Sequence, residues 1–292
     1  MTKKQLIIFL ALVFIVKLGF AQNQKKLKIF ISVDMEGITG VVNWEDVDRD
    51  GKDYGYFRQI MTKETNAAIE GALDAAATEI IVRDSHGSAR NILPEMLHKQ
   101  SKLIRDWSGG FMSMMEGIDK TFDAVIFIGY HAKAGTPNAI LEHTMSSRNI
   151  IDVSINDISL PEAGINALIA GYFDVPVVFV AGDKALCNQA KELFGNVETV
   201  AVKEGLGNAA LNLHPEESRE RIRTGVKNAL LNLNKYKPYK LSSPYRLIVK
   251  YKNEEMVNEK SLQPGVTRTG DWELTYRSND ILDIMKVFSL MH

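Results

Sequence analysis

Apolar runs and amphipathic segments alternate over the first two thirds of the chain. Five runs rich in Val, Ile and Phe are candidate strands: 27–33, 79–83, 124–128, 175–181 and 198–203. Runs that stay apolar, without polar residues at every second position, are typical of strands covered on both faces. Between several of them, segments such as 56–77 and 161–173 place apolar and small residues at helical spacing. The pattern predicts an α/β fold with a largely parallel central sheet flanked by helices.

After about residue 203 the pattern changes. The elements expected there are a charged amphipathic helix at 214–234, alternating strands at 245–253 and 272–278, and a final helix from about Asn279. Alternation of apolar and polar positions is typical of antiparallel strands with one solvated face. We therefore predict an α/β core over 27–203, which would hold any catalytic or metal site, and a smaller α+β subdomain over 204–292.

The first 21 residues have the features of a secretory signal peptide. Lys3 and Lys4 precede an apolar run from Leu6 to Val16, and small residues lead to a cleavage site near Ala21. The run of about 11 residues is short against the roughly 20 that a membrane-spanning helix needs. We expect an exported, periplasmic protein with no stable membrane anchor once the signal peptide over 1–21 is removed.

Charge and cysteine content exclude some classes of protein. The net charge is −1, and loss of the signal peptide, which has three lysines and no acid, lowers it to −4. No basic patch is present, so we expect no nucleic-acid partner. Cys187 is the single cysteine, so an intramolecular disulfide is excluded. It lies in a helical segment, where a packed small residue is expected more than a nucleophile.

Residues with metal-binding side chains follow three of the predicted strands. Asp34 and Glu36 follow the first, His86 the second and His131 the third. Ligands of open α/β sheets bind beyond the carboxyl ends of the strands, so these side chains are expected to converge. Asp34 and Glu36 point to the same side of an extended chain, and Gly37 allows a turn directly after them. Facing carboxylates repel each other unless a cation lies between them.

Carboxylate oxygen together with imidazole nitrogen suits zinc or a similar divalent ion. Glu162, which follows Pro161 at the start of a predicted helix, is a candidate fifth ligand. Each residue also has a simpler interpretation: a solvated turn acid, a hydrogen-bonded histidine, or an acid paired with a helix dipole. Spacing alone leaves the metal site and these interpretations open.

Several sequence blocks, in order from about Lys28 to Asn208, resemble the DppA-like D-aminopeptidase family of binuclear zinc metallopeptidases. The blocks are "SVDMEGITG", "RDSHGSARN", "FIGYHAKAGTPNAILEHTMSS", "INDISLPEAGINALIAGYFDVPVVFVAGD" and "VAVKEGLG". The resemblance implies two zinc ions per chain and five ligands: Asp34, Glu36, His86, His131 and Glu162. It also implies that Asp34 bridges the ions and that His143, in "EHTMSS", is the catalytic residue.

The resemblance further implies an aminopeptidase that acts on short peptides, chiefly D-amino-acid peptides. It also implies a homo-oligomer, because the family assembles as a decameric ring. A metal-activated water would attack the amide, with His143 as general acid/base or as a hydrogen-bond donor to the oxyanion. Asp84 and Tyr130 are candidates to orient ligands, although Tyr130 could equally pack under the sheet, and Asp183 is expected to cap a helix. Arg83 stands where the family has asparagine, which bears on substrate range.

Two other classes of function remain open at this point. A binuclear amidohydrolase or phosphoesterase would use the same metal site, and Arg83 is a basic residue of the kind that phosphate requires. A periplasmic binding protein would need no catalytic His143 and commonly has two similar lobes, of which the sequence shows no repeat. "GLGNAA" at 205–210 imitates a dinucleotide-binding motif, but Pro215 follows it closely, so we expect a loop.

Overall fold

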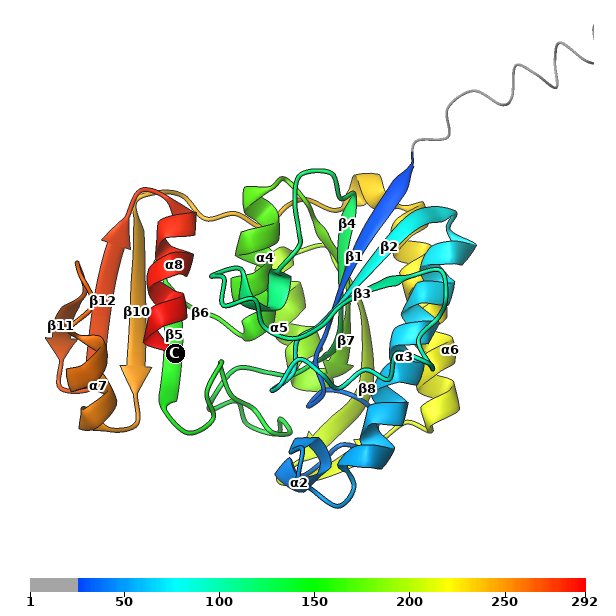
Figure 1. The fold of residues 1–292 in the computed structure, drawn as a ribbon, viewed down its shortest axis with the longest axis horizontal. Coiled ribbons are helices and arrows are strands. Elements are labelled where there is room, and N and C mark those ends of the chain that lie inside the picture. Colours follow the sequence, from blue (N-terminus) through cyan, green and yellow to red (C-terminus); the bar gives the residue numbers. More distant parts are fainter. Residues whose placement is uncertain (1–25) are drawn as a thin grey trace, which may run out of the picture.

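Two sheets organise the protein (Figure 1). The computed structural model describes residues 26–292, so the predicted signal peptide at 1–21 lies outside the described residues. The larger sheet has seven strands in the order β3 (Lys102–Ile104), β2 (Ala77–Asp84), β1 (Leu27–Val33), β4 (Ala124–Tyr130), β7 (Val177–Asp183), β8 (Glu198–Leu206) and β9 (Ala209–Asn212). The smaller has five, in the order β11 (Thr267–Gly270), β12 (Glu273–Ser278), β10 (Tyr245–Tyr251), β5 (Ile150–Ile155) and β6 (Ile158–Ser159).

The seven-stranded sheet is parallel except for β9, which pairs antiparallel with β8. Every residue of β4 and β7 is buried, as their unbroken apolar runs predict. The chain builds the sheet outward in one direction through β1, β2 and β3 and in the other through β4, β7 and β8. The strand order therefore reverses between β1 and β4, which is where open α/β sheets bind ligands. The predicted fold class is confirmed.

Helices cover both faces of this sheet (Figure 1). On one face lie α3 (Tyr54–Asp74) and α6 (Pro215–Leu231), and on the other α4 (Glu162–Tyr172) and α5 (Lys184–Phe194). Gly71 lets α3 approach α6 closely, because a Cβ there would lie 2.4 Å from the Arg223 carbonyl oxygen. The side chain of Asp183 accepts a hydrogen bond from the Leu186 amide, so its predicted role as a helix cap is confirmed. Of the helices within 26–292, none is both long and apolar enough to cross a membrane.

The five-stranded sheet is antiparallel and packs on the α4 side of the molecule through α8 (Ile281–Met291). Its strands β5 and β6 come from within 27–203, whereas β9 and α6, after residue 203, belong with the seven-stranded sheet. The two sheets therefore do not divide the chain at one point, and the predicted subdomain boundaries stay a prediction. The remaining short helices are α2 (Trp44–Val47), α7 (Glu254–Lys260) and the 3₁₀ turns Ser113–Met115 and Leu233–Lys235.

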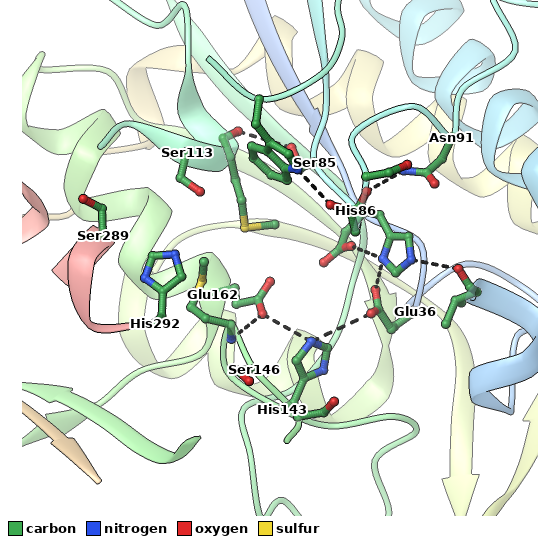
Figure 2. A pocket seen from close by; sticks show the side chains of 18 of the residues that line it. Glu36, Ser85, His86, Asn91, Ser113, His143, Ser146, Glu162, Ser289 and His292 are labelled. Atoms are coloured by element: carbon green, nitrogen blue, oxygen red, sulfur yellow. Dashed lines mark hydrogen bonds and ion pairs between the residues drawn. The ribbon is translucent and has the colours of Figure 1, made fainter. Parts of the chain in front are cut away.

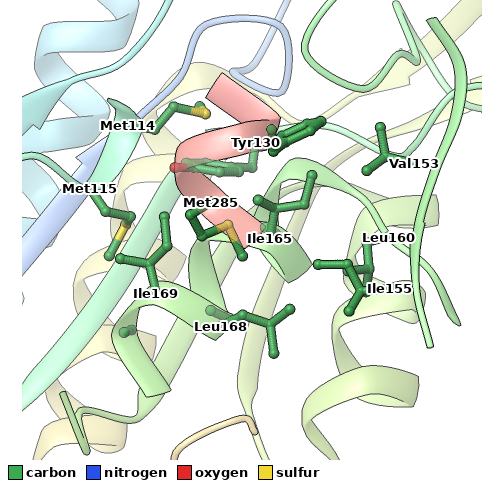
Figure 3. Close-up of a cluster of buried hydrophobic side chains, with 14 of the residues drawn as sticks. Met114, Met115, Tyr130, Val153, Ile155, Leu160, Ile165, Leu168, Ile169 and Met285 are labelled. Atoms are coloured by element: carbon green, nitrogen blue, oxygen red, sulfur yellow. The ribbon is translucent and has the colours of Figure 1, made fainter. Parts of the chain in front are cut away.

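Two hydrophobic clusters lie on opposite faces of the seven-stranded sheet. One joins the sheet to α3 and α6 and includes Ile31, Ile69 and Val226. The other joins the sheet to α4, α8 and the five-stranded sheet, with side chains such as Ile169 and Met285 meeting in its centre (Figure 3). The methionine-rich segment 111–117 contributes Met114 and Met115 to this second cluster, the gap-filling use that is usual for methionine.

Candidate functional site

The carboxyl ends of β1, β2 and β4 open into a cavity of about 720 Å³. Asp34 and Glu36 follow β1, His86 follows β2 and His131 follows β4 directly. The cavity is lined by Asp34, Glu36 and His86 together with His143 and Glu162 from later in the chain. His131 lies behind them and is fully buried. The structure thus brings all six predicted site residues into one place (Figure 2 labels four of them).

A tight turn presents the first two carboxylates. The amide of Asp34 donates to the Ile128 carbonyl at 2.8 Å, and the amide of Gly37 donates to the Gly129 carbonyl at 2.7 Å. Residue 37 must be glycine, because a Cβ there would lie 1.8 Å from the Tyr130 carbonyl oxygen. The chain thus turns against the end of β4, and both acids are held inside the protein.

His86 and His131 contact different oxygens of the same carboxylate. His86 Nδ1 lies 3.3 Å from Asp34 Oδ1 and 3.0 Å from Glu36 Oε2. His131 Nε2 lies 3.6 Å from Asp34 Oδ2 and 3.6 Å from Glu162 Oε2. Asp34 therefore stands between two groups of ligand atoms, with one oxygen directed toward each.

His143 lies in the same cluster. Its Nε2 is 3.5 Å from Glu162 Oε1 and 3.8 Å from Glu36 Oε1, and its ring stacks on that of His131 with centroids 4.0 Å apart. The loop that carries it is attached to the site, because the Met145 amide donates to Glu162 Oε1 at 2.7 Å. By position alone, His143 is as well placed to bind a metal as to move a proton.

Each of the three histidines has one ring nitrogen directed at a backbone carbonyl. His86 Nε2 lies 3.0 Å from the Val47 carbonyl, His131 Nδ1 lies 3.0 Å from that of Ala132, and His143 Nδ1 lies 2.8 Å from that of Leu141. A carbonyl only accepts hydrogen bonds, so the proton of each neutral ring is on that nitrogen. The other nitrogen is then free for a metal or a proton, and this arrangement is usual for metal-binding histidines.

The donor atoms are of the kind that binds divalent cations. Three groups each offer ligand atoms within 4.8 Å of one another: Asp34, Glu36 and His86; Asp34, His131 and Glu162; and Glu36, His131 and His143. His131 Nε2 is buried without a hydrogen-bond partner among the described residues, although its neighbours are carboxylates. A buried polar atom without a partner is costly, and a cation at this point would satisfy it. Carboxylate oxygen and imidazole nitrogen are the donors that zinc accepts.

Without a cation, protons would have to stabilise the cluster. Burial and the charge of Glu36 raise the pKa of Asp34 to about 8. Burial alone would lower the pKa of His131, but Glu162 and the other carboxylates raise it to about 10. His131 in turn holds the pKa of the buried Glu162 at about 2. Protons on these groups would therefore take the place of a cation, and metal binding would displace them.

Asp84 and Asn91 support the loop that carries His86. Asp84 accepts hydrogen bonds from the backbone amides of Asn91 at 2.6 Å and Ile92 at 2.7 Å. The Asn91 side-chain amide donates to Asp84 at 2.8 Å and to the His86 carbonyl at 2.6 Å. Asp84 was expected to orient a ligand, and its hydrogen bonds hold the loop of His86, in part through Asn91, a residue that nothing in the sequence singles out. Its role in metal binding stays a prediction.

Tyr130 and Arg83 are buried, and their hydrogen bonds are to groups outside the cluster. The hydroxyl of Tyr130 is 2.6 Å from Ser32 Oγ and accepts from Asn166 at 3.0 Å, so it fixes the packing beneath the sheet end. Arg83 is fully buried, donates to the Asp106 carbonyl at 2.6 Å and stacks on Trp107 at 4.5 Å. Neither is among the residues that line the cavity.

The outer walls of the cavity come from several elements. Figure 2 shows Ser289 and His292, from the α8 end of the chain, on the side opposite His86 and Glu36. No strand end precedes His292 directly, so the pattern of strand ends did not point to it. Among the other lining side chains are two that are aromatic, Trp44 and Trp107, and two that are basic, Arg49 and Arg148. The "GLGNAA" segment starts no helix, as expected, but it is part of the β8–β9 hairpin: only Gly207 and Asn208 form the turn, and the other four residues are strand where a loop was predicted.

Comparisons with known proteins agree with the fold. The family model described as D-aminopeptidase, Peptidase M55, matches residues 27–290. A D-aminopeptidase of Bacillus subtilis (strain 168) is 37% identical over 269 residues, which cover 91% of this chain and 96% of the relative. The solved structure described as "Zn-dependent D-aminopeptidase DppA from Bacillus subtilis, a self-compartmentalizing protease" matches with a TM-score of 0.87 and 36% identity, over 91% of this chain and 96% of that chain. The predicted family is confirmed, and the chain belongs to the Peptidase M55 family of D-aminopeptidases.

Proposed function

We propose that this protein is a zinc-dependent aminopeptidase that removes the N-terminal residue of short peptides, with D-amino-acid peptides as its substrates. The observation that carries the proposal is the buried cluster at the switch point of the sheet, in which two groups of ligand atoms share Asp34. The matched relatives support it, since both are D-aminopeptidases and one is described as zinc-dependent.

We assign the five ligands as Asp34, Glu36, His86, His131 and Glu162, with two zinc ions per chain. Asp34 would bridge the ions, because its two oxygens lie toward His86 and toward His131 respectively. Bound zinc would supply a water of lowered pKa as nucleophile and would polarise the scissile carbonyl.

His143 is the proposed general acid/base. Its Nδ1 is held by the Leu141 carbonyl, which leaves Nε2 free to face the carboxylates of the cluster. Burial and the neighbouring His131 lower the pKa of His143, so the ring is neutral near pH 7 and can accept a proton at Nε2. In hydrolysis it would take the proton from the attacking water and return it to the leaving amine.

The cavity suits a short peptide with both ends free. At its deep end the carboxylates can accept hydrogen bonds from the α-amino group of the substrate. At its walls, Arg49 and Arg148 have no ion-pair partner within the part of the chain that the structure describes, and guanidinium groups bind carboxylates well. A substrate held at both ends would place its first peptide bond at the metals, which explains removal of one terminal residue.

Assembly and location belong to the same proposal. The matched structure is described as a self-compartmentalizing protease, which supports a homo-oligomer for this chain, with a decameric ring as the specific prediction. The features of residues 1–21 support export to the periplasm, where peptides from cell-wall material would be available.

The experiment is to follow release of free amino acid from D-Ala-D-Ala and from L-Ala-L-Ala by zinc-loaded protein. Preferential cleavage of the D-peptide is expected. Bound metal without cleavage of either peptide would favour an amidohydrolase or phosphoesterase, which a panel of amides and phosphate esters then distinguishes. Binding of peptides without turnover and without metal would favour a binding protein.

A further inference from the structure

A buried lysine lies directly beneath the loop that carries Glu36. Lys203 comes from β8, near its carboxyl end, and is only 2% exposed. Its Nζ donates to three backbone carbonyls of one short loop: Glu36 at 2.5 Å, Ile38 at 3.1 Å and Val41 at 2.6 Å. An ammonium group has three N–H donors, so each of them meets an acceptor.

The position of this charge is unusual for a structural residue. Within residues 26–292, Lys203 has no carboxylate within ion-pair distance, so its charge is balanced only by carbonyl dipoles and by acids farther away. Burying an ammonium group is costly unless its hydrogen bonds are made, and an apolar residue would fill the same space without that cost. The feature that distinguishes Lys203 from an apolar residue is therefore its three hydrogen bonds to these carbonyls.

Other side chains attach the far end of the same loop. The Thr39 amide donates to Glu64 at 3.0 Å, and the Gly40 amide donates to Asn212 at 2.9 Å. The side chains of Glu64 and Asn212 thus hold residues 39 and 40, whereas that of Lys203 holds the carbonyl of residue 36 itself. Lys203 therefore fixes the main chain from which the Glu36 carboxylate extends.

We propose that Lys203 is a positioning residue for the metal centre, whose ammonium group holds the 36–41 loop and thereby fixes Glu36 as a zinc ligand. The inference rests on the proposed function, because the placement of Glu36 matters only if it binds zinc. Partners that orient metal ligands from behind change metal affinity about 10- to 100-fold when they are removed. Lys203 acts in this way on the backbone of Glu36, whereas the usual partner contacts the side chain of the ligand.

The test compares the zinc affinity of Lys203→Met with that of the wild type, by competition with a chelator of known affinity. Lys203→Gln, which keeps two N–H donors without the charge, is measured in parallel and carries the test if the Met variant does not fold. We expect zinc binding to weaken about 10- to 100-fold in both variants, with kcat falling more than KM rises.

Two controls separate positioning from loss of stability. Lys184→Met removes an exposed lysine near the same sheet edge, which pairs with Glu204 at 2.7 Å and does not contact the loop. Val249→Ala removes buried methyl groups in the five-stranded sheet and lowers stability away from the metals. Both should bind zinc as the wild type does. If the Lys203 variants lose no more affinity than Val249→Ala, the inference is wrong, whereas a wild type that binds no zinc would instead overturn the proposed function.

Discussion

The two sheets differ in what gathers at the ends of their strands. In the parallel sheet, the carboxyl ends of β1, β2 and β4 share one edge and bring together Asp34, His86 and His131. In the antiparallel sheet, neighbouring strands end on opposite edges, so no single edge collects side chains in this way. Strand direction therefore decides which of the two sheets can carry the chemistry.

The antiparallel sheet also contributes to the site, through the segments that are attached to it. Its short strand β6 leads into Pro161 and the first turn of α4, where Glu162 enters the cluster. Helix α8, which packs against β10 and β12, brings Ser289 and His292 to the outer wall of the cavity. One sheet thus supplies most of the proposed ligands, and the other supplies the support and part of the wall.

The largest effect on the metal site of the parallel sheet is expected from Asp34→Ala. The change removes the carboxylate shared by two groups of ligand atoms, so zinc content should fall and peptide hydrolysis should drop to background. Elemental analysis and an amino-acid release assay on the same sample measure both. Activity retained in this variant would remove Asp34 from the proposed bridging position.

His143→Ala separates a catalytic group from a ligand in the same cluster. We expect zinc content near that of the wild type and kcat lower by about 10²- to 10⁴-fold, the usual contribution of a general acid/base. Zinc content is measured beside single-substrate kinetics. Loss of one zinc in parallel with activity would make His143 a ligand instead.

Zinc binding should strengthen as the pH rises from 6.5 to 8. The pKa of Asp34 is raised to about 8 and that of His131 to about 10 without metal, so both carry protons at the lower pH and zinc must displace them. For each proton that zinc displaces, the apparent affinity should rise about tenfold per pH unit, as long as the pH is below the pKa of the group that carries the proton. Calorimetry in buffers of different ionisation enthalpy measures the protons released. A zinc affinity that does not change with pH over this range would contradict the claim that Asp34 and His131 carry protons when no metal is bound.

Asn91→Ala tests the support of His86. The variant loses the donor to the His86 carbonyl and to Asp84, so zinc affinity should fall about 10- to 100-fold with the fold retained. Chelator competition measures the affinity, and far-UV circular dichroism checks the fold. Unchanged affinity would show that the backbone bonds of Asp84 hold the loop alone.

The smallest effect on the metal centre is expected from Leu274→Ala in the antiparallel sheet. Leu274 is fully buried in β12, and its truncation should lower the free energy of unfolding by about 2–5 kcal/mol. Zinc affinity should stay within about twofold of the wild type, since ΔΔG values at distant sites are largely independent. Chemical denaturation and zinc titration test both parts, and a large loss of affinity would mean that the two sheets are coupled.

Much of the fold was predictable because it depends on local pattern. Five of the six parallel strands, β1, β2, β4, β7 and β8, and helices α3, α4 and α6 follow apolar runs and helical periodicity, and their order predicts which ends converge. The short strand β3 was not predicted. The pairing of β5 with β10 was not predictable, because Ser154 lies opposite Ile248, far along the chain, and nothing local selects that partner.

The site was predictable in part for the same reason. Asp34, Glu36, His86 and His131 follow strand ends, whereas the assignment of His143 depended on the family resemblance, since it lies in an irregular loop. Asn91 and His292 carry no sequence feature that marks them. Lys203 does carry one, a single cation within a buried parallel strand, which in hindsight indicates a specific set of acceptors.

The central claim is a pair of zinc ions that share Asp34, and the most direct test is the number of zinc ions bound per chain. Elemental analysis of the purified mature protein, reconstituted with zinc and freed of excess metal, should give about two zinc ions per chain, and Asp34→Ala should give clearly fewer. One zinc ion per chain, or none, in the wild type would contradict the account.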